Sequence, residues 1–458
     1  MATSILSIGQ TALAAAQAGI STTGHNIANA ATPGYNRQVV VQSAAQPQNF
    51  GVGFLGQGTE VASIKRVYNE YLVAQERTSQ ATKSGLDSYY AQIRQIDNLL
   101  ADPVAGLSPA IQDFFSGIQE MASNPGSIPA RQAALSSAES LASRFQSLSG
   151  RLNEIDQGVN SQITSSVDVI NAYAEQLATL NDTIGRLQRG SGQTANDLLD
   201  QRDQLILDLN KEIKATVVKQ DNGDYNVFIG NGQPLVVGTK TSQLTTMVSP
   251  GDQKIEVAYV TSSGPVIVGA SSLVGGNLGG LVAFRSQTLE PTQASLDSLA
   301  TGLAASFNAQ HQLGQDIDGN PGGNFFSATG ASDFSVAITD PRLIAAAANT
   351  GGVGDNRNAL LLAGLQTSNT MNGGTTTYQG AYSQIVSQIG NKTRELDVTS
   401  SAAGKMLTET TLSIQSESGV NLDEEAANLL RYQQAYQAAG KVMQIASEMF
   451  DVLLSIGR

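Results

Sequence analysis

This chain has few histidines and no cysteines for metal binding or nucleophilic chemistry. Its 458 residues include two histidines and no cysteine, which removes thiolate zinc sites, disulfides and thiol nucleophiles together. Neither His25 nor His311 has a partner at metal-ligand spacing such as i, i+4. The sequence also lacks a GxSxG elbow, a Walker lysine motif and an HExxH motif. It therefore predicts no active site, no metal and no cofactor, and the protein is expected not to be an enzyme.

Four weaker patterns have structural interpretations. Residues 51–56 match GxGxxG, but a strand-like run follows where a dinucleotide site needs a helix, which favours a turn-forming loop. Residues 316–321 resemble the start of a calcium loop, yet proline occupies the position that requires glycine, so Asx-turns are expected. The acids at 423–425 stand where a helix begins and suit its dipole. Tyr432 and Tyr436, at i and i+4, predict a packed helix face.

Composition excludes further classes of protein. Asp and Glu outnumber Lys and Arg by 39 to 26, which gives a net charge of -13 and disfavours binding to nucleic acid. No run of about 18 apolar residues occurs, so no membrane partner is expected. The first twenty residues do not resemble a conventional signal peptide, which leaves a cytoplasmic location and export by another route both open. Only 14% of residues are charged, and such a surface suits packing against copies of the same chain.

Both ends of the chain predict amphipathic helices. At the N-terminus an apolar residue recurs every seven positions until Pro33, at Leu6, Leu13, Ile20 and Ile27. At the C-terminus Asn421 is a suitable N-cap, and Glu424 stands where the acid of a capping box would be. The apolar face of this second helix comprises Leu422, Leu429, Tyr436, Met443, Phe450 and Leu453. Neither seam can be buried alone, so we expect the two helices to pair with each other and with neighbouring subunits through these ten residues.

Between the ends, periodicity predicts a mainly α fold with a β insertion. A helical series over 141–187 would form a rod about 70 Å long. Strand-like runs begin near residue 213, where Asn222-Gly223 favours a type I′ hairpin. We expect an elongated multi-domain chain with paired coiled-coil-like terminal helices at one end and a small outer β domain at the other. The predicted domains are a terminal helical core (1–40 plus 419–458), a helical bundle (41–212 plus 284–418, loop-rich at 313–380) and the β domain (213–283).

Residues 25–38 resemble the N-terminal signature of the flagellar rod, hook and hook-associated axial proteins. The residues that carry this resemblance are Asn26, Asn29, Thr32, Pro33, Gly34, Tyr35, Arg37 and Gln38. Within that family, the Thr-Pro-Gly-Tyr sequence and the segment 198–205 are most similar to the hook-associated proteins of the hook-filament junction. Residues 419–436 resemble the family's terminal helix. The region 213–380 departs most and is short, without the additional outer domain of longer relatives.

The resemblance implies a structural subunit that joins hook to filament in the bacterial flagellum. It implies a terminal core near a central channel, self-association into a ring, and the hook protein and a second junction hook-associated protein as partners. Export through the flagellar type III apparatus, with a dedicated chaperone, would account for the missing signal peptide and would make the protein secreted. Two alternatives stay open at this point: another axial role (rod, hook or filament-adjacent hook-associated protein), and a secreted hydrolase active in 213–380.

Overall fold

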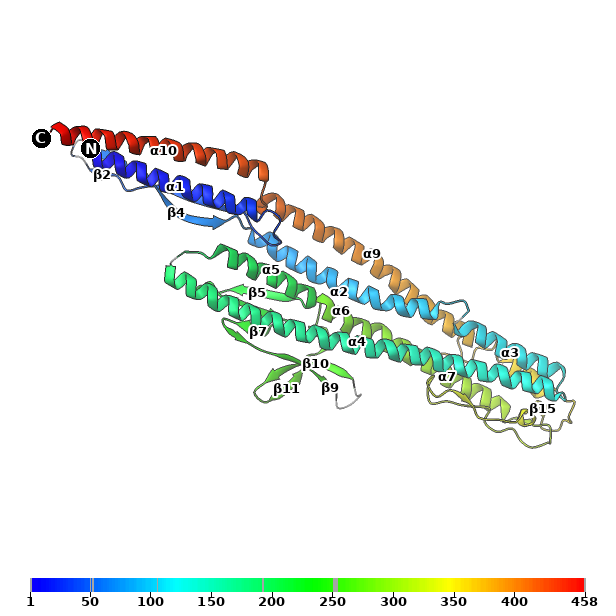
Figure 1. The fold of residues 1–458 in the computed structure, drawn as a ribbon. Coiled ribbons are helices and arrows are strands. Elements are labelled where there is room, and N and C mark those ends of the chain that lie inside the picture. Colours follow the sequence, from blue (N-terminus) through cyan, green and yellow to red (C-terminus); the bar gives the residue numbers. More distant parts are fainter. Residues whose placement is uncertain are drawn as a thin grey trace.

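The computed structural model describes residues 2–49, 51, 53–104, 106–191, 193–249 and 254–456. The chain forms a long rod in which most helices run nearly parallel to the long axis (Figure 1). Its helices are α1 (Ala2–Ala28), α2 (Glu70–Leu100), α3 (Leu107–Ser123), α4 (Ile128–Ser191), α5 (Asn196–Glu212), α6 (Gly276–Phe284), α7 (Glu290–His311), α8 (Arg357–Gly364), α9 (Tyr378–Ser418) and α10 (Leu422–Ile456). A short π-helix, η2 (Arg285–Leu289), joins α6 to α7. The predicted mainly α, elongated fold is confirmed.

The two chain ends lie together at one end of the rod. There α1 packs against α10, as expected, and a two-stranded antiparallel ribbon of β1 (Gln38–Ala44) and β4 (Thr59–Arg66) lies along α1 (Figure 1). Between these strands the chain forms the short pair β2 (Gln48–Asn49) and β3 (Phe54–Leu55). Gly51 and Gly53 have positive φ angles in this hairpin, which accounts for the glycines of the GxGxxG match.

The helical bundle is built on α4, a single helix of 64 residues that measures about 96 Å at 1.5 Å per residue. It extends beyond the predicted series at both ends and packs on α3, α5, α6 and α7. Helix α2 packs on α9, and its N-cap Asn69 accepts hydrogen bonds from the amides of Tyr71 and Leu72. The buried apolar residues of the bundle and its sheets form one cluster, to which no described residue of α1 or α10 belongs. The terminal pair therefore has a buried seam of its own.

Two antiparallel sheets cover one flank of α4. One has the strand order β5-β6-β7-β8 and the other β11-β10-β9. Their strands are β5 (Ala215–Lys219), β6 (Tyr225–Ile229), β7 (Gln233–Val237), β8 (Lys240–Thr241), β9 (Leu244–Val248), β10 (Ile255–Thr261) and β11 (Gly264–Ile267). Side chains of α4 fix the sheets, because Asn181 donates to the carbonyl of Tyr225 (2.9 Å) and Asn171 to that of Leu244 (2.8 Å). A 3-10 turn, η1 (Ala270–Ser272), leads back to α6.

Two expectations about the β region are wrong. The sheets lie beside the C-terminal half of α4 and not at the far end of the rod (Figure 1). Asn222-Gly223 does not form a type I′ turn, because Gly223 has a positive φ of 87° but Asn222 does not. The amide of Gly223 instead donates to the carbonyl of Gln220 (2.9 Å), so the hairpin between β5 and β6 is one residue longer. The proposed division into three domains stays a prediction.

The far end of the rod consists of α3, α8, the start of α4 and the loops between α7 and α9. The short elements of these loops are β12 (Gly314–Gln315), β13 (Phe326–Ser327), β14 (Ser335–Val336), η3 (Pro341–Leu343) and β15 (Ala347–Ala348). His311 is buried here, where its Nδ1 lies 2.8 Å from the carbonyl oxygen of Gly323 and its Nε2 accepts from the amide of Ala345 (2.9 Å). Asp316 accepts from the amides of Asp318 and Asn320, as Asx-turns do. These residues stabilise loops.

Candidate assembly site

The seam between α1 and α10 consists mainly of small side chains. In α1 the residues at three- and four-residue spacing on this side are Gly9, Ala12, Ala16, Gly19, Thr23 and Asn26, all buried or half-buried. In α10 the inward residues recur every seven positions, at Glu425, Tyr432, Ala439 and Ala446. The helices are antiparallel and so close that a Cβ on Gly19 would lie 2.5 Å from the ring of Tyr432, and one on Gly9 2.8 Å from Met443. Small residues permit this approach.

Of the ten apolar residues predicted for the seam, the nine whose side chains are described lie mostly beside its small residues, and Met443 faces Gly9. Leu13, Ile20, Leu429 and Met443 are half-buried. The more exposed residues are Leu6 (41%), Ile27 (36%), Leu422 (55%), Tyr436 (40%) and Phe450 (48%). The side chain of Leu453 lies outside the described residues. The C-terminal part of α10 also exposes Ile445, Met449, Val452 and Leu454. Within one chain, these large side chains leave much of their apolar surface uncovered.

Asn26 is the hub of the signature residues. It is 1% exposed, and its carboxamide makes four hydrogen bonds. Its nitrogen donates to the carbonyl of Gln38 (2.9 Å) and to the carboxylate of Glu425 (3.1 Å). Its oxygen accepts from the hydroxyl of Tyr35 (2.7 Å) and the amide of Gln38 (2.9 Å). All donor and acceptor positions of the group are thereby used, and Asn26 ties α1 to β1 and α10.

The Thr-Pro-Gly-Tyr sequence reverses the chain between α1 and β1. The amide of Tyr35 donates to the carbonyl of Thr32 (3.2 Å), and Gly34 has a φ of 77°, as the third residue of a type II turn requires. Asn29 supports this turn by accepting from the hydroxyl of Thr32 (3.2 Å). Burial and the nearby carboxylates on α5 raise the pKa of Tyr35, so its phenol keeps the proton that it donates to Asn26.

Three carboxylates of α5 hold the turn and the ribbon against the bundle. Asp197 accepts from the side chain of Gln38 (2.7 Å), and Asp200 accepts from the backbone (3.0 Å) and side chain (2.7 Å) of Asn36. Arg66 donates to both Asp200 (2.8 Å) and Asp203 (2.6 Å), and these three side chains are nine-tenths buried. Burial raises the pKa of Asp200, and the hydrogen bonds from Arg66 and Asn36 counteract this effect. Residues 25–38 thus contact the segment 198–205 through Asn36 and Asp200.

The start of α10 completes this arrangement. The side chain of Asn421 accepts from the amides of Asp423 (3.0 Å) and Glu424 (3.4 Å), which confirms the predicted N-cap. The capping-box role of Glu424 is wrong, because its carboxylate pairs with Arg37 (2.6 Å). The amide of Arg37 also donates to the carbonyl of Ser418 (2.8 Å), the last residue of α9. The three family-like segments, far apart in sequence, therefore meet at one place, which we call the joint: residues 26–38, 197–204 and 418–425.

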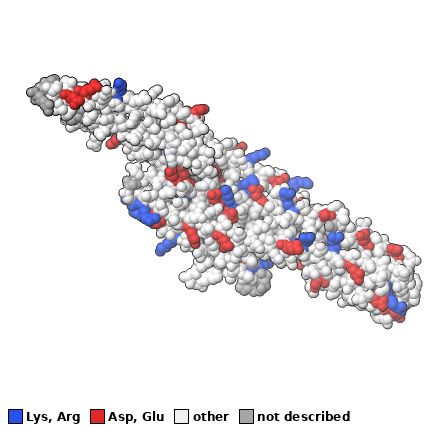
Figure 2. All heavy atoms as spheres, in the orientation of Figure 1, with Lys and Arg blue, Asp and Glu red and all other residues white. Residues whose placement is uncertain are grey.

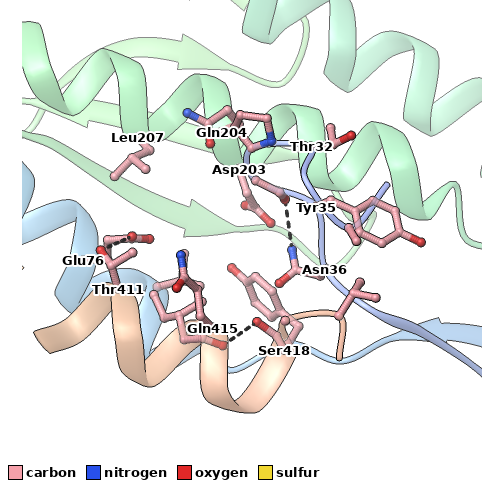
Figure 3. A pocket seen from close by; sticks show the side chains of 18 of the residues that line it. Thr32, Tyr35, Asn36, Glu76, Asp203, Gln204, Leu207, Thr411, Gln415 and Ser418 are labelled. Atoms are coloured by element: carbon pink, nitrogen blue, oxygen red, sulfur yellow. Dashed lines mark hydrogen bonds between the residues drawn. The ribbon is translucent and has the colours of Figure 1, made fainter. Parts of the chain in front are cut away.

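The joint contains a cavity of about 620 Å³ between the terminal pair and the bundle. Figure 3 shows Gln204 and Leu207 of α5 on one side, Thr411 and Gln415 of α9 on the other, and the labelled turn residues at one end. The other face of the turn borders a second cavity of about 370 Å³. The joint is thus built from hydrogen bonds and ion pairs around cavities, and not from a continuous apolar core.

The described residues contain no group of three or more His, Asp or Glu side chains arranged to hold a metal ion. None of the described helices is both long and apolar enough to span a bilayer. On the face drawn in Figure 2, acidic and basic side chains are interspersed over the bundle, and most of the terminal pair is uncharged. The exposed apolar residues of α10 suit packing of protein on protein.

Comparisons with known proteins identify the family. The model for the helical domain of the flagellar hook-associated protein FlgK matches residues 93–326, and the model for the C-terminal part of the flagellar basal body rod FlgEFG proteins matches residues 414–456. Flagellar hook-associated protein 1 of Salmonella typhimurium is 35% identical over 99% of this chain and 100% of its own length, and that of Escherichia coli K12 is 34% identical with the same coverage.

More distant relatives come from the same family. Flagellar hook-associated protein 1 of Bacillus subtilis is 26% identical over 97% of this chain and 96% of its own length. The solved structure of the flagellar hook junction protein FlgK from Burkholderia pseudomallei has a TM-score of 0.70 at 26% identity and covers 75% of this chain and all of its own. The Salmonella alignment extends over 551 positions against 458 residues here, so that relative has segments that this chain lacks. The chain belongs to the flagellar hook-associated protein 1 family, whose members are structural proteins of the flagellum and not enzymes.

Proposed function

We propose that this protein is a structural subunit of the hook-filament junction that assembles into a ring through the outer faces of α1 and α10. The observation that carries the proposal is the division of side chains between the two sides of the terminal pair. Small residues fill the seam inside one chain, and large apolar residues such as Tyr436 and Phe450 stay 40% and 48% exposed. Exposed apolar residues in such number are typical of a surface that another protein covers.

Identical neighbours are the partners that this surface suits best. Residues 1–36 contain no charged side chain, and Arg37 is the only one before Glu60. The α1 side of the surface therefore offers almost no charge for selecting a partner, so contact area and shape must contribute most there. A contact between two different faces of identical subunits continues around a ring when its rotation closes. Most of the ten residues predicted for the interface lie on these outer faces or at their edges, and their role in assembly is part of the proposal.

The relatives suggest which other proteins contact the ring. The Burkholderia protein is described as a flagellar hook junction protein, which supports the hook protein and a second junction hook-associated protein as neighbours of the ring. We further propose that the chain is secreted through the flagellar type III apparatus with the help of a dedicated chaperone. The low charge and the separate seam of the terminal pair are compatible with passage as an unfolded chain and with folding at the assembly site.

The test replaces outer-face residues in a strain that lacks the native gene. Tyr436→Asp and Phe450→Asp each place a charge on the exposed face of α10 without touching the small-residue seam. The matched control is Leu361→Asp on α8, an apolar residue that is 59% exposed at the far end of the rod. Motility, electron microscopy of the cell surface and immunoblots of the culture supernatant are the readouts.

We expect the two α10 variants to appear in the supernatant, while the cells carry hooks without filaments and release flagellin. The control should restore filaments and motility. Normal filaments in both α10 variants would contradict assembly through the outer face of α10. Loss of filaments in the control alone would instead assign the contact to the far end of the rod. Retention of every variant inside the cell would show an effect on export, and the supernatant blot separates that outcome from failed assembly.

A further inference from the structure

The chain contains three Asn-Gly sequences, at 222–223, 231–232 and 372–373. Asparagine before glycine is chemically the least stable asparagine, because the glycine amide nitrogen can attack the side-chain carbonyl carbon without hindrance from a Cβ. The reaction needs a glycine amide that is free of hydrogen bonds and a carboxamide that is free to turn toward it. The three sites therefore share the same dipeptide and differ in what the fold does to these two groups.

The first two sites are restrained. The amide of Gly223 donates to the carbonyl of Gln220 (2.9 Å), and the carboxamide of Asn222 donates to Asp224 (2.8 Å). Likewise, the amide of Gly232 donates to a carbonyl at the end of β6 (3.1 Å), and Asn231 donates to the hydroxyl of Ser272 (2.7 Å). Both turns also belong to the four-stranded sheet, whose ladders must open before the turns can move. Each site thus has both reacting groups occupied.

The third site has neither restraint. Asn372 (φ 50°) and Gly373 (φ 70°) are the central residues of a turn closed by the amide of Gly374 on the carbonyl of Met371 (3.0 Å), which is the type I′ pattern. Neither the carboxamide of Asn372 nor the amide of Gly373 has a hydrogen-bond partner in the described part of the chain. Asn372 is exposed, and the space that a Cβ on Gly373 would occupy is empty to 4 Å. A single bridge, between Met371 and Thr376, holds the strand ends together.

We propose that Asn372 is a site of spontaneous modification, at which the native protein converts to aspartate and isoaspartate. The amide nitrogen of Gly373 bonds to Cγ of Asn372, the bond from Cγ to the carboxamide nitrogen breaks, and ammonia leaves. Water then opens the resulting succinimide ring at one of its two carbonyls and gives aspartate or isoaspartate. The net change is the gain of one water and the loss of one ammonia, without oxidant, reductant or enzyme.

The modification changes the entry to α9. Either product adds a negative charge to the turn, and isoaspartate also adds a methylene to the main chain, so the turn from Met371 to Thr376 can no longer close with the same geometry. The next residue, Thr377, is the N-cap of α9 and accepts from the amide of Gly380 (3.0 Å). Helix α9 continues from there to the joint. The modification of Asn372 thus loosens the first turn of α9, the helix that leads to α10.

The experiment compares the reaction at the three Asn-Gly sites within the same molecule. The purified full-length chain is incubated at mildly alkaline pH, both folded and in concentrated urea, and sampled over days. Cleavage after Lys and Arg places Asn372 in the fragment 358–392 and the other two sites in 220–240. Fragment mass spectra then report the carboxamide-to-carboxylate change at each asparagine and distinguish isoaspartate. The Asn372→Gln variant, which cannot form the five-membered ring, is the control for the assignment.

In the folded chain we expect Asn372 to react faster than Asn222 and Asn231 by roughly fivefold or more, the factor that breaking one hydrogen bond of ordinary strength imposes. In urea the three rates should converge, because the sequence at each site is the same dipeptide. The variant should show no product at position 372. Equal rates in the folded chain, or a faster reaction at 222 or 231, would overturn the proposal. A rate difference that persists in urea would also overturn it, because its cause would then not be the fold.

Discussion

Three glycines on α1 differ in what a methyl group would meet, and this difference predicts three stabilities. A Cβ on Gly24 meets nothing within 4 Å. Because alanine loses less backbone entropy than glycine in a helix, Gly24→Ala should stabilise the terminal pair by about 0.5–1 kcal/mol. A Cβ on Gly9 would lie 2.8 Å from Cγ of Met443, but this flexible side chain can move aside. Gly9→Ala should therefore stay within about 0.5 kcal/mol of the native chain.

Gly19→Ala is expected to be the damaging substitution. Three ring atoms of Tyr432 would lie 2.5–2.6 Å from the new Cβ, well inside van der Waals contact, and a ring cannot fold out of the way. Overpacking of this kind costs about 1–3 kcal/mol. Because alanine also favours the helix more than glycine does, the net loss in stability of the terminal pair should be up to about 2 kcal/mol. The difference between the Gly19 and Gly24 variants, about 1–3 kcal/mol, isolates the contact with the ring.

Native-state hydrogen exchange of the α1 and α10 amides is the suitable assay. The terminal pair has its own seam, so it can open while the bundle stays folded, and a global unfolding curve would miss that opening. A difference of 1.4 kcal/mol changes protection tenfold. In a Tyr432→Ala background the Gly19 and Gly24 substitutions should behave alike, which gives a coupling energy above about 1 kcal/mol for the pair. Equal protection in the two single variants, or no coupling, would refute the close approach of the helices at Gly19.

Three further predictions concern buried polar groups. Asn26→Leu keeps the branching and the number of side-chain heavy atoms but leaves the Glu425 carboxylate, the Tyr35 hydroxyl and the peptide groups of Gln38 unpaired, so the free energy of opening of α1 and α10, measured by native-state hydrogen exchange, should fall by about 3 kcal/mol; a loss below about 1 kcal/mol would contradict this role of Asn26. Arg66→Met should cost about 3–5 kcal/mol in urea titrations, and adding Asp200→Asn should restore part of this loss, because one stranded charge is removed. Burial holds the pKa of His311 below its ordinary value of 6.5. A depressed folded pKa gives stability that is present above 6.5 and is lost as the pH falls below it, so thermal unfolding should show this slope and His311→Gln should lack it.

The terminal helices could be predicted from sequence, but the side on which they meet could not. Heptad spacing of Leu6, Leu13, Ile20 and Ile27 indicates one helix and an apolar face. Heptad spacing is recognised from large apolar side chains, so it predicts that the large residues form the seam. On α1 the actual seam uses Gly9 and the small residues that follow it at three- and four-residue spacing, to which hydrophobic periodicity gives little weight. A signal was present in the sequence, because the small residues from 9 to 26 repeat at three- and four-residue spacing.

The joint shows a second limit of prediction from sequence. Each of its three segments could be singled out from the sequence, yet nothing in their spacing indicates that Asn26 and Glu425, separated by 399 positions, share a hydrogen bond. The sequence does not distinguish Asp200 and Asp203 of α5 from the acidic residues on the exposed face of an ordinary helix. The type I′ turn predicted at residues 222–223 occurs instead at residues 372–373, for a related reason. The pairing of the flanking strands determines how many residues a turn contains. The segments on either side of residues 372–373 have little strand character, so the sequence does not indicate a two-residue turn there.

The chemistry of the terminal pair implies a sequence of events in assembly. Apart from Tyr432 and Met443, the seam consists mainly of small or polar side chains, so the pairing of α1 with α10 inside one chain removes less apolar surface from water than a seam of large apolar residues would. The polar hub at Asn26 then fixes the orientation of the two helices without adding much apolar burial. The large residues on the outer faces lose their contact with water only when a neighbouring subunit arrives. The free chain should accordingly show lower hydrogen-exchange protection in α1 and α10 than in α4, and assembly should raise that protection most at the outer faces. Such a pair stays separable until its neighbours are in place, and we expect this property in a protein that polymerises through its ends.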